Sequence, residues 1–135
     1  QELFRLRTSG LVPLLAHPER YWGCTTAQVA DWRRVGAVIQ TDAAILLDRG
    51  SMGRLAASLL EAGLVDLLAS DNHGDSRSLR VARTWLEEMG ASEQAEILTT
   101  ENPRRLLAGE PLLPVAPVVP ERGFAARLRA LFLRK

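Results

Sequence analysis

Two polar clusters in an otherwise apolar chain contain the residue types that bind metal ions. The first is His17-Pro18-Glu19-Arg20 and the second is Ser70-Asp71-Asn72-His73, and together they hold both histidines of the 135-residue chain. Imidazole and carboxylate groups are common ligands of divalent metals. Each cluster follows a run of mainly apolar residues, so each is expected at the end of a buried strand.

In the second cluster, the spacing of Asp71 and His73 suits two ligands of one ion. On extended backbone, residues i and i+2 point the same way, so both side chains can face the same point. Asp-x-His alone is a weak motif, and a single histidine at a strand end is more often a hydrogen-bonded structural residue. The position directly after a buried strand, with Ser70 before and Gly74 after, favours ligands.

In the first cluster, Pro18 keeps His17 out of the right-handed helical region and so fixes its direction. The Arg20 guanidinium offers a planar fork of donors that suits a phosphate or a carboxylate. Glu19 has two interpretations of about equal weight, as the residue that orients an imidazole or as a salt-bridge partner of Arg20. Arg77 follows the second cluster near a helix start, where anions bind readily, so two arginines beside a metal would suit a phosphate ester.

The elements that must position these clusters alternate between helices and strands. Gly10, Gly36 and Gly63 lie 26 and 27 residues apart, and each ends a helical segment just before an apolar run. This repeat predicts an α/β fold with parallel strands and flanking helices, whose working residues lie at the carboxyl ends of the strands. The predicted strands are 11–16, 37–40 and 64–69, and Gln40-Thr41-Asp42 ends the second. The predicted helices are one that Thr25 or Thr26 caps and Gly36 ends, then 53–61 and 78–89, with one or two short helices in 92–109.

Three strands cannot close a barrel, so we expect either a small open sheet or, preferably, one half of a larger barrel. Residues 111–120 contain four prolines and read as an extended linker. Residues 121–135 are expected to form a basic amphipathic helix. That helix packs on its own barrel or a neighbouring subunit in the preferred interpretation, and docks on an acidic membrane surface in the alternative.

Composition excludes several classes of function. The net charge of +1 argues against nucleic-acid binding, and no apolar run is long enough for a membrane span. The single cysteine, Cys24, excludes an internal disulfide and suits a reducing cytoplasm. A thiol phosphatase needs Arg six positions after its nucleophilic cysteine, where this chain has Ala30, so Cys24 is expected to be incidental.

An ordered set of phrases resembles a known family. Ala16 to Tyr21, Val38 to Gln40, Leu47 to Gly53, Gly63 to His73 and Glu101 to Pro103 occur in the order found in the carboxyl half of bacterial metal-dependent tyrosine phosphatases of the PHP superfamily. The resemblance covers roughly residues 1–110. It implies the carboxyl half of a distorted (β/α)7 barrel, with two or three metal ions, often manganese.

The resemblance also implies a reaction and its residues. A metal-activated water attacks phosphotyrosine directly, His17, Asp71 and His73 are metal ligands, and Arg20 and Arg77 bind the phosphate. The implied substrate is the phosphotyrosine tail of a bacterial tyrosine autokinase that controls capsule or exopolysaccharide synthesis.

Two departures from the family pattern bear on these expectations. The His-x-His pair and the further His and Glu ligands of the family's amino half are not in this sequence, and missing strands would leave an apolar sheet edge exposed. Arg77 lies six positions after Asp71, where the family has seven, so its role is less secure than that of Arg20. Two alternatives remain open: a PHP phosphatase for a small molecule such as histidinol phosphate, and an inactive fragment that serves only as an interaction module. The oligomeric state is also left open.

Overall fold

The centre of the molecule is a three-stranded parallel sheet. The computed structural model describes residues 1–119, and its strands are β1 (Leu14–Ala16), β2 (Val38–Asp42) and β3 (Leu67–Ala69), in the order β1-β2-β3. Leu14 pairs with Val38, and Gln40 pairs with Leu67, both in parallel register. The predicted α/β class with parallel strands is therefore confirmed.

The strands occupy only part of the predicted runs. β1 and β3 form at the last three residues of theirs, whereas β2 continues two residues past its predicted end, to Asp42. Pro13 has no N–H to donate to a neighbouring strand, which explains the late start of β1. The longer β2 matters for function, because it carries Asp42 to the edge of the sheet where the polar clusters lie.

The helices follow the predicted alternation with the strands. Thr25, not Thr26, is the N-cap of its helix, and the reciprocal hydrogen bonds between Thr25 and Gln28 form a capping box. Pro103 lies in the first turn of the last helix, as predicted. The α-helices are α1 (Glu2–Thr8), α2 (Thr26–Arg34), α3 (Ser51–Glu61), α4 (Leu79–Glu88), α5 (Ser92–Glu96) and α6 (Asn102–Leu107), and shorter turns are the 3₁₀ helices η1 (Pro18–Arg20) and η2 (Ile45–Leu47) and the π-helical turn η3 (Ile97–Glu101).

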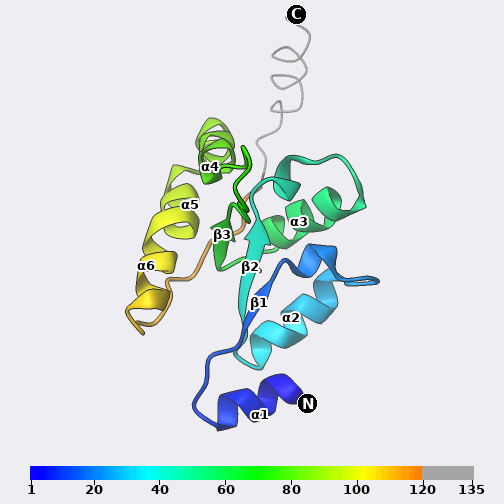
Figure 1. The fold of residues 1–135 in the computed structure, drawn as a ribbon, viewed down its shortest axis with the longest axis vertical. Helices are drawn as coiled ribbons and strands as arrows, with labels where there is room; N and C mark the ends of the chain where they lie inside the picture. Colours follow the sequence, from blue (N-terminus) through cyan, green and yellow to red (C-terminus); the bar gives the residue numbers. More distant parts are fainter. Residues whose placement is uncertain (120–135) are drawn as a thin grey trace, which may run out of the picture.

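Helices lie on both sides of the sheet. Figure 1 shows α2 and α3 on one side and α4, α5 and α6 on the other, with α1 at the end from which the strands start. All five residues of β2 are buried, as expected for a strand covered on both faces. The largest fully buried apolar side chains are Ile39, Leu59, Leu60, Leu68, Leu86, Leu98, Val29 and Val65.

Buried polar contacts fix the start of the sheet. Arg33 of α2 binds the Asp66 carboxylate through two nitrogens at 3.3 and 2.7 Å and donates to the Gly63 carbonyl at 2.8 Å. Asp66 also accepts the backbone N–H of Ile39. Asn102, which is fully buried, donates to the carbonyls of Asp66 and Leu113 and accepts the N–H of Leu113. These contacts hold α2, β3, α6 and the segment after α6 together.

The sheet edge at β1 carries exposed apolar residues. Leu11, Val12 and Leu14 are between 40% and 56% exposed, in agreement with the expected apolar edge. Residues 111–119 contain neither helix nor strand, although Val115 and Val118 are buried in the core. The predicted tail helix at 121–135 lies outside the described residues. Within residues 1–119, no helix has the length and apolar character needed to cross a membrane.

Candidate functional site

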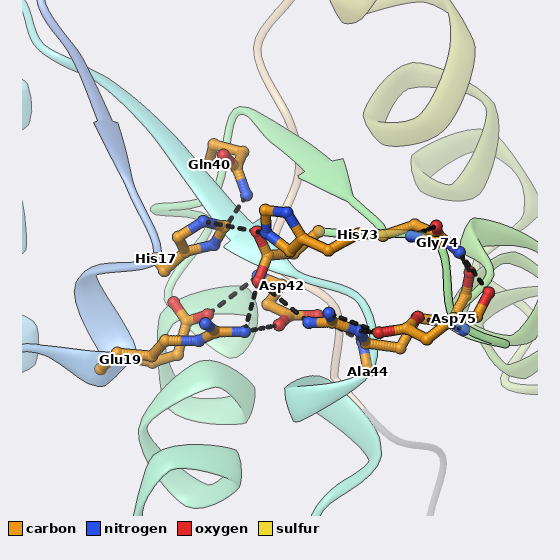
Figure 2. Close-up of polar contacts among 12 residues, drawn as sticks. His17, Glu19, Gln40, Asp42, Ala44, His73, Gly74 and Asp75 are labelled. Carbon is orange, nitrogen blue, oxygen red and sulfur yellow. Dashed lines mark hydrogen bonds and ion pairs between the residues drawn. The ribbon is translucent and has the colours of Figure 1, made fainter.

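The polar clusters meet where the three parallel strands end. His17 follows β1 directly, Asp42 is the last residue of β2, and Asp71 lies two residues beyond β3. Because the strands are parallel, their carboxyl ends share one edge of the sheet. Figure 2 shows His17 and Glu19 on the β1 side of Asp42, while His73 reaches the group from the loop after β3 and Asp75 lies farther along that loop.

Two of these residues have an unusual backbone. His17 and Asp71 have φ angles of 52° and 48°, and they are the only non-glycine residues with positive φ in the described part of the chain. Pro18 does keep His17 out of the right-handed helical region, but the residue adopts the left-handed region instead of an extended one. Such strain persists only where the surrounding structure enforces it, and it is concentrated at functional sites.

Three donor groups lie close enough to share one cation. Nitrogen or oxygen atoms of His17, Asp42 and Asp71 all lie within 4.8 Å of one another, and His17 Nε2 is 3.3 Å from Asp71 Oδ1. One imidazole and two carboxylates form a donor set that suits manganese, zinc or iron. The residues present therefore fit a divalent metal ion.

His73 approaches this group from its open side. Its Nε2 lies 3.2 Å from Asp71 Oδ1, but the side chain is 76% exposed, against 22% for His17. The predicted pairing of Asp71 and His73 is thus present in the geometry, although His73 is not one of the three closest donors. The ligand roles of His17, Asp71 and His73 remain predictions.

Two arginines reach the same carboxylate oxygen. Arg20 Nη2 lies 2.8 Å and Arg77 Nη1 lies 3.1 Å from Asp71 Oδ2. Arg20 also forms an ion pair with the buried Asp42, and Arg77 is held by Asp75 at 2.6 Å. The shorter loop before Arg77 therefore does not prevent its guanidinium from reaching the site.

The ionisation of Asp71 follows from these neighbours. Desolvation opposes its charged form, but the charge of His17 and the hydrogen bonds from His73 and Arg20 outweigh that effect and lower the pKa of the Asp71 carboxyl. Asp71 is therefore a carboxylate at neutral pH. An anionic oxygen is what both a metal ion and a guanidinium require.

Side-chain contacts with the backbone shape the loop that carries Asp71 and Arg77. Asn72 donates to the carbonyls of Asp75 and Arg77 at 2.8 and 2.7 Å, and its Oδ1 accepts the N–H of Gly74. Asp75 accepts the N–H of Arg77 as well. These bonds fold the loop back on itself and turn Arg77 towards Asp71.

Glu19 has neither of the roles predicted for it. Its Oε1 accepts the backbone N–H of Asp42 at 2.9 Å, and within residues 1–119 it makes no hydrogen bond to an imidazole or to Arg20. Glu19 is only 3% exposed, and burial raises the pKa of its carboxyl. It therefore fixes the end of β2, because η1 folds over that end and brings the carboxylate to the last N–H of the strand.

The residue pattern places Asp42 and Gln40 at a strand end but assigns neither of them a specific role. Asp42 has a side chain only 1% exposed, and its Oδ1 accepts the N–H of Ala44 at 2.7 Å. Gln40 Nε2 lies 3.2 Å from His17 Nδ1. The sequence feature that could have pointed to these two residues is their position at a predicted strand end, between the two polar clusters. Cys24 supports the exclusion of a thiol mechanism, since burial raises the pKa of its thiol.

Comparisons with known proteins agree with this geometry. A sequence model of the family described as "Capsular polysaccharide synthesis, CpsB/CapC" matches residues 1–108. The fold is similar to a chain from the crystal structures of YwqE from Bacillus subtilis and CpsB from Streptococcus pneumoniae, described as unique metal-dependent tyrosine phosphatases. The TM-score is 0.76 and the sequence identity 26%, over 90% of this chain and 51% of that chain. This chain therefore spans about half the length of that relative, as expected for one half of a PHP-type barrel. The search of curated proteins found no match.

Proposed function

Because this chain belongs to the CpsB/CapC family of capsular polysaccharide synthesis, we propose that it supplies the carboxyl half of a metal-dependent phosphatase for phosphotyrosine. One observation carries the proposal. Asp71 stands at the centre of a cluster in which two imidazoles approach one of its carboxylate oxygens and two guanidiniums approach the other. Metal-binding and phosphate-binding groups thus lie side by side at one sheet edge.

The metal side of this cluster consists of His17, Asp71 and His73, with Asp42 close enough to contribute. A divalent ion bound there supplies charge that stabilises phosphoryl oxygens and makes a nearby water more acidic. The low pKa of Asp71 keeps its carboxylate charged for this purpose. Manganese is the ion we propose, because carboxylate and imidazole ligands suit it.

The phosphate side consists of Arg20 and Arg77. A phosphate that enters between them would replace Asp71 Oδ2 as the acceptor of their N–H groups. A guanidinium binds phosphate through two parallel hydrogen bonds, which orients the phosphorus as well as attracting it. Donors held in place before the reaction stabilise the charge that develops on the phosphoryl oxygens. The ion pairs with Asp42 and Asp75 hold both arginines in that position.

The substrate that we propose is the phosphotyrosine tail of a bacterial tyrosine autokinase in the cytoplasm. The family description links the chain to capsule synthesis, and the solved relatives are described as tyrosine phosphatases. Histidinol phosphate is not favoured as a substrate, because neither description points to small-molecule metabolism. The basic residues within 121–135 would suit docking on the kinase or on an acidic membrane surface, and we retain such docking as part of the proposal.

The full protein that carries this chain should be assayed on an aryl phosphate with Mn²⁺. We expect activity to disappear with a chelator, to return when Mn²⁺ is restored, and to be lost in His17→Ala, Asp71→Asn and His73→Ala. Arg80→Ala is the matched control, because Arg80 is exposed and its side chain makes no hydrogen bond or ion pair within residues 1–119. Activity that survives chelation, or that survives Asp71→Asn, would show that the metal mechanism is wrong. Faster turnover of phosphoserine than of phosphotyrosine peptides would refute the substrate class.

A further inference from the structure

Gln40 contacts His17 through both its backbone and its side chain. The Gln40 carbonyl accepts the backbone N–H of His17 at 2.8 Å, and the side-chain amide nitrogen lies 3.2 Å from His17 Nδ1. Gln40 is on the central strand and is only 6% exposed, so water is not available to replace this partner. Figure 2 shows the amide of Gln40 directed at the imidazole ring.

The two nitrogens of the His17 ring therefore face different surroundings. Nδ1 faces Gln40, whereas Nε2 faces Asp71 Oδ1 at 3.3 Å and belongs to the group of donors that can share a cation. A neutral imidazole carries one proton, and only the nitrogen without it can bind a metal. Binding through Nε2 consequently requires that the proton be on Nδ1.

A glutamine can serve both forms of the ring. Its terminal amide has a donor nitrogen and an acceptor oxygen at nearly equivalent positions, and a half-turn of the amide exchanges them. When Nε2 carries the proton and donates to Asp71, the Gln40 Nε2 donates to Nδ1. When a cation takes Nε2, the Gln40 Oε1 can accept the proton that Nδ1 then carries.

We propose that Gln40 is a positioning residue whose amide reverses when a cation binds, so that His17 changes from the Nε2–H form to the Nδ1–H form. This inference rests on the proposed metal site. Some residues hydrogen-bond the second ring nitrogen of a metal-binding histidine. Replacing such a residue commonly weakens metal affinity about 10–100-fold. The role is distinct from a merely structural one, because it determines where the imidazole proton lies.

The test is nitrogen NMR of the ¹⁵N-histidine-labelled chain at a pH where the ring is neutral, with Zn²⁺ as a diamagnetic probe. In the unaltered chain we expect the His17 signals of the Nε2–H form without Zn²⁺ and of the Nδ1–H form with it. Gln40→Met, which can neither donate nor accept strongly, should weaken Zn²⁺ binding about 10–100-fold in calorimetry. Gln94→Met is the control, since Gln94 lies in α5 away from the strand ends, and it should bind as the unaltered chain does.

Gln40→Glu provides a second variant that retains an acceptor and removes the donor. In this variant His17 should be in the Nδ1–H form even without Zn²⁺, and affinity should stay within about threefold of the unaltered chain. The proposal is overturned if Gln40→Glu keeps the Nε2–H form, or if Gln40→Met binds Zn²⁺ as tightly as the unaltered chain. Loss of phosphatase activity is not a readout here, so the proposed reaction and the proposed role of Gln40 can fail separately.

Discussion

The Arg20 guanidinium and the Asp42 carboxylate form an ion pair at the end of the central strand. Asp42 is almost fully buried and comes from β2, whereas Arg20 comes from the 3₁₀ turn after β1. The pair aims the guanidinium at Asp71 in the loop after β3. The position of the proposed phosphate-binding group is thus determined by a carboxylate 22 residues later in the chain.

Replacement of that carboxylate should affect substrate binding more than metal binding. In Asp42→Asn the amide oxygen can still accept the Ala44 N–H, but the charge that holds Arg20 is lost. We expect KM for an aryl phosphate to rise about tenfold, the effect of losing one charge-assisted hydrogen bond. Steady-state kinetics and Mn²⁺ titration should be measured together. A loss of Mn²⁺ affinity with unchanged KM would instead assign Asp42 to the metal.

Replacing an arginine by lysine keeps the positive charge but removes the planar guanidinium. We expect this change to lower kcat by different amounts at Arg20 and Arg77. Arg20→Lys removes the planar guanidinium, whose Nη2 contacts both Asp42 and Asp71, and we expect kcat to fall about 100-fold. Arg77→Lys should have a smaller effect, because Arg77 lies in the loop after β3 and its guanidinium also pairs with Asp75. Arg80→Lys serves as the control and should leave the rate unchanged. Equal losses for Arg20→Lys and Arg80→Lys would contradict the assignment.

Asn102 should be a main contributor to stability although it lies at the opposite end of the sheet. Asn102→Ala would leave the N–H of Leu113 and the carbonyls of Asp66 and Leu113 without this partner in a buried region. We expect the free energy of unfolding in urea to fall by about 2–4 kcal/mol. The control is Leu107→Ala, because Leu107 is 90% exposed and should matter little. Similar urea midpoints for the two variants would show that the Asn102 contacts contribute little.

The pH dependence of stability should include a contribution from Glu101. Hydrogen bonds from Arg104 and Arg105 lower the pKa of its carboxyl from 4.5 to about 2. Because the folded-state pKa is the lower one, this contribution is fully present above pH 4.5 and is lost as the pH falls towards about 2. Glu101→Gln should therefore reduce the urea midpoint at pH 7, and the difference from the unaltered chain should narrow below pH 4.5. The difference is expected to be small, since the pair is partly exposed.

A matched acidic residue checks this prediction. Glu93→Gln changes the same kind of side chain at an exposed position in α5, and its urea midpoint should follow that of the unaltered chain at every pH. A difference for Glu101→Gln that stays constant from pH 7 to pH 3 would contradict the ion-pair explanation.

Much of the site could be predicted from sequence because it depends on where strands end. Apolar runs located the strands, and the parallel arrangement then required His17 and Asp71 to meet at one edge. The roles of Glu19 and Asp42 could not be predicted in the same way. Glu19 binds the N–H of Asp42 only because η1 folds over the end of β2, and that is a tertiary contact without a local sequence signal.

Backbone conformation set a second limit on prediction. Pro18 excludes one region of backbone space for His17, but the choice between extended and left-handed conformations depends on how the chain turns out of β1. The same holds for strand length. Nothing in the residues of the predicted strand 37–40 required β2 to continue through Asp42, which is paired with Ala69 of the neighbouring strand.

The left-handed backbone at His17 and Asp71 gives this site an evolutionary signature. Each non-glycine residue in that conformation costs on the order of 1 kcal/mol, which glycine would not. Selection for stability alone would thus favour glycine at both positions, and only selection for chemistry opposes it. In a descendant of this chain that is released from catalysis, glycine should replace these two residues early, while the buried core remains intact. The residues at these two positions would then distinguish catalytically active homologues from inactive ones.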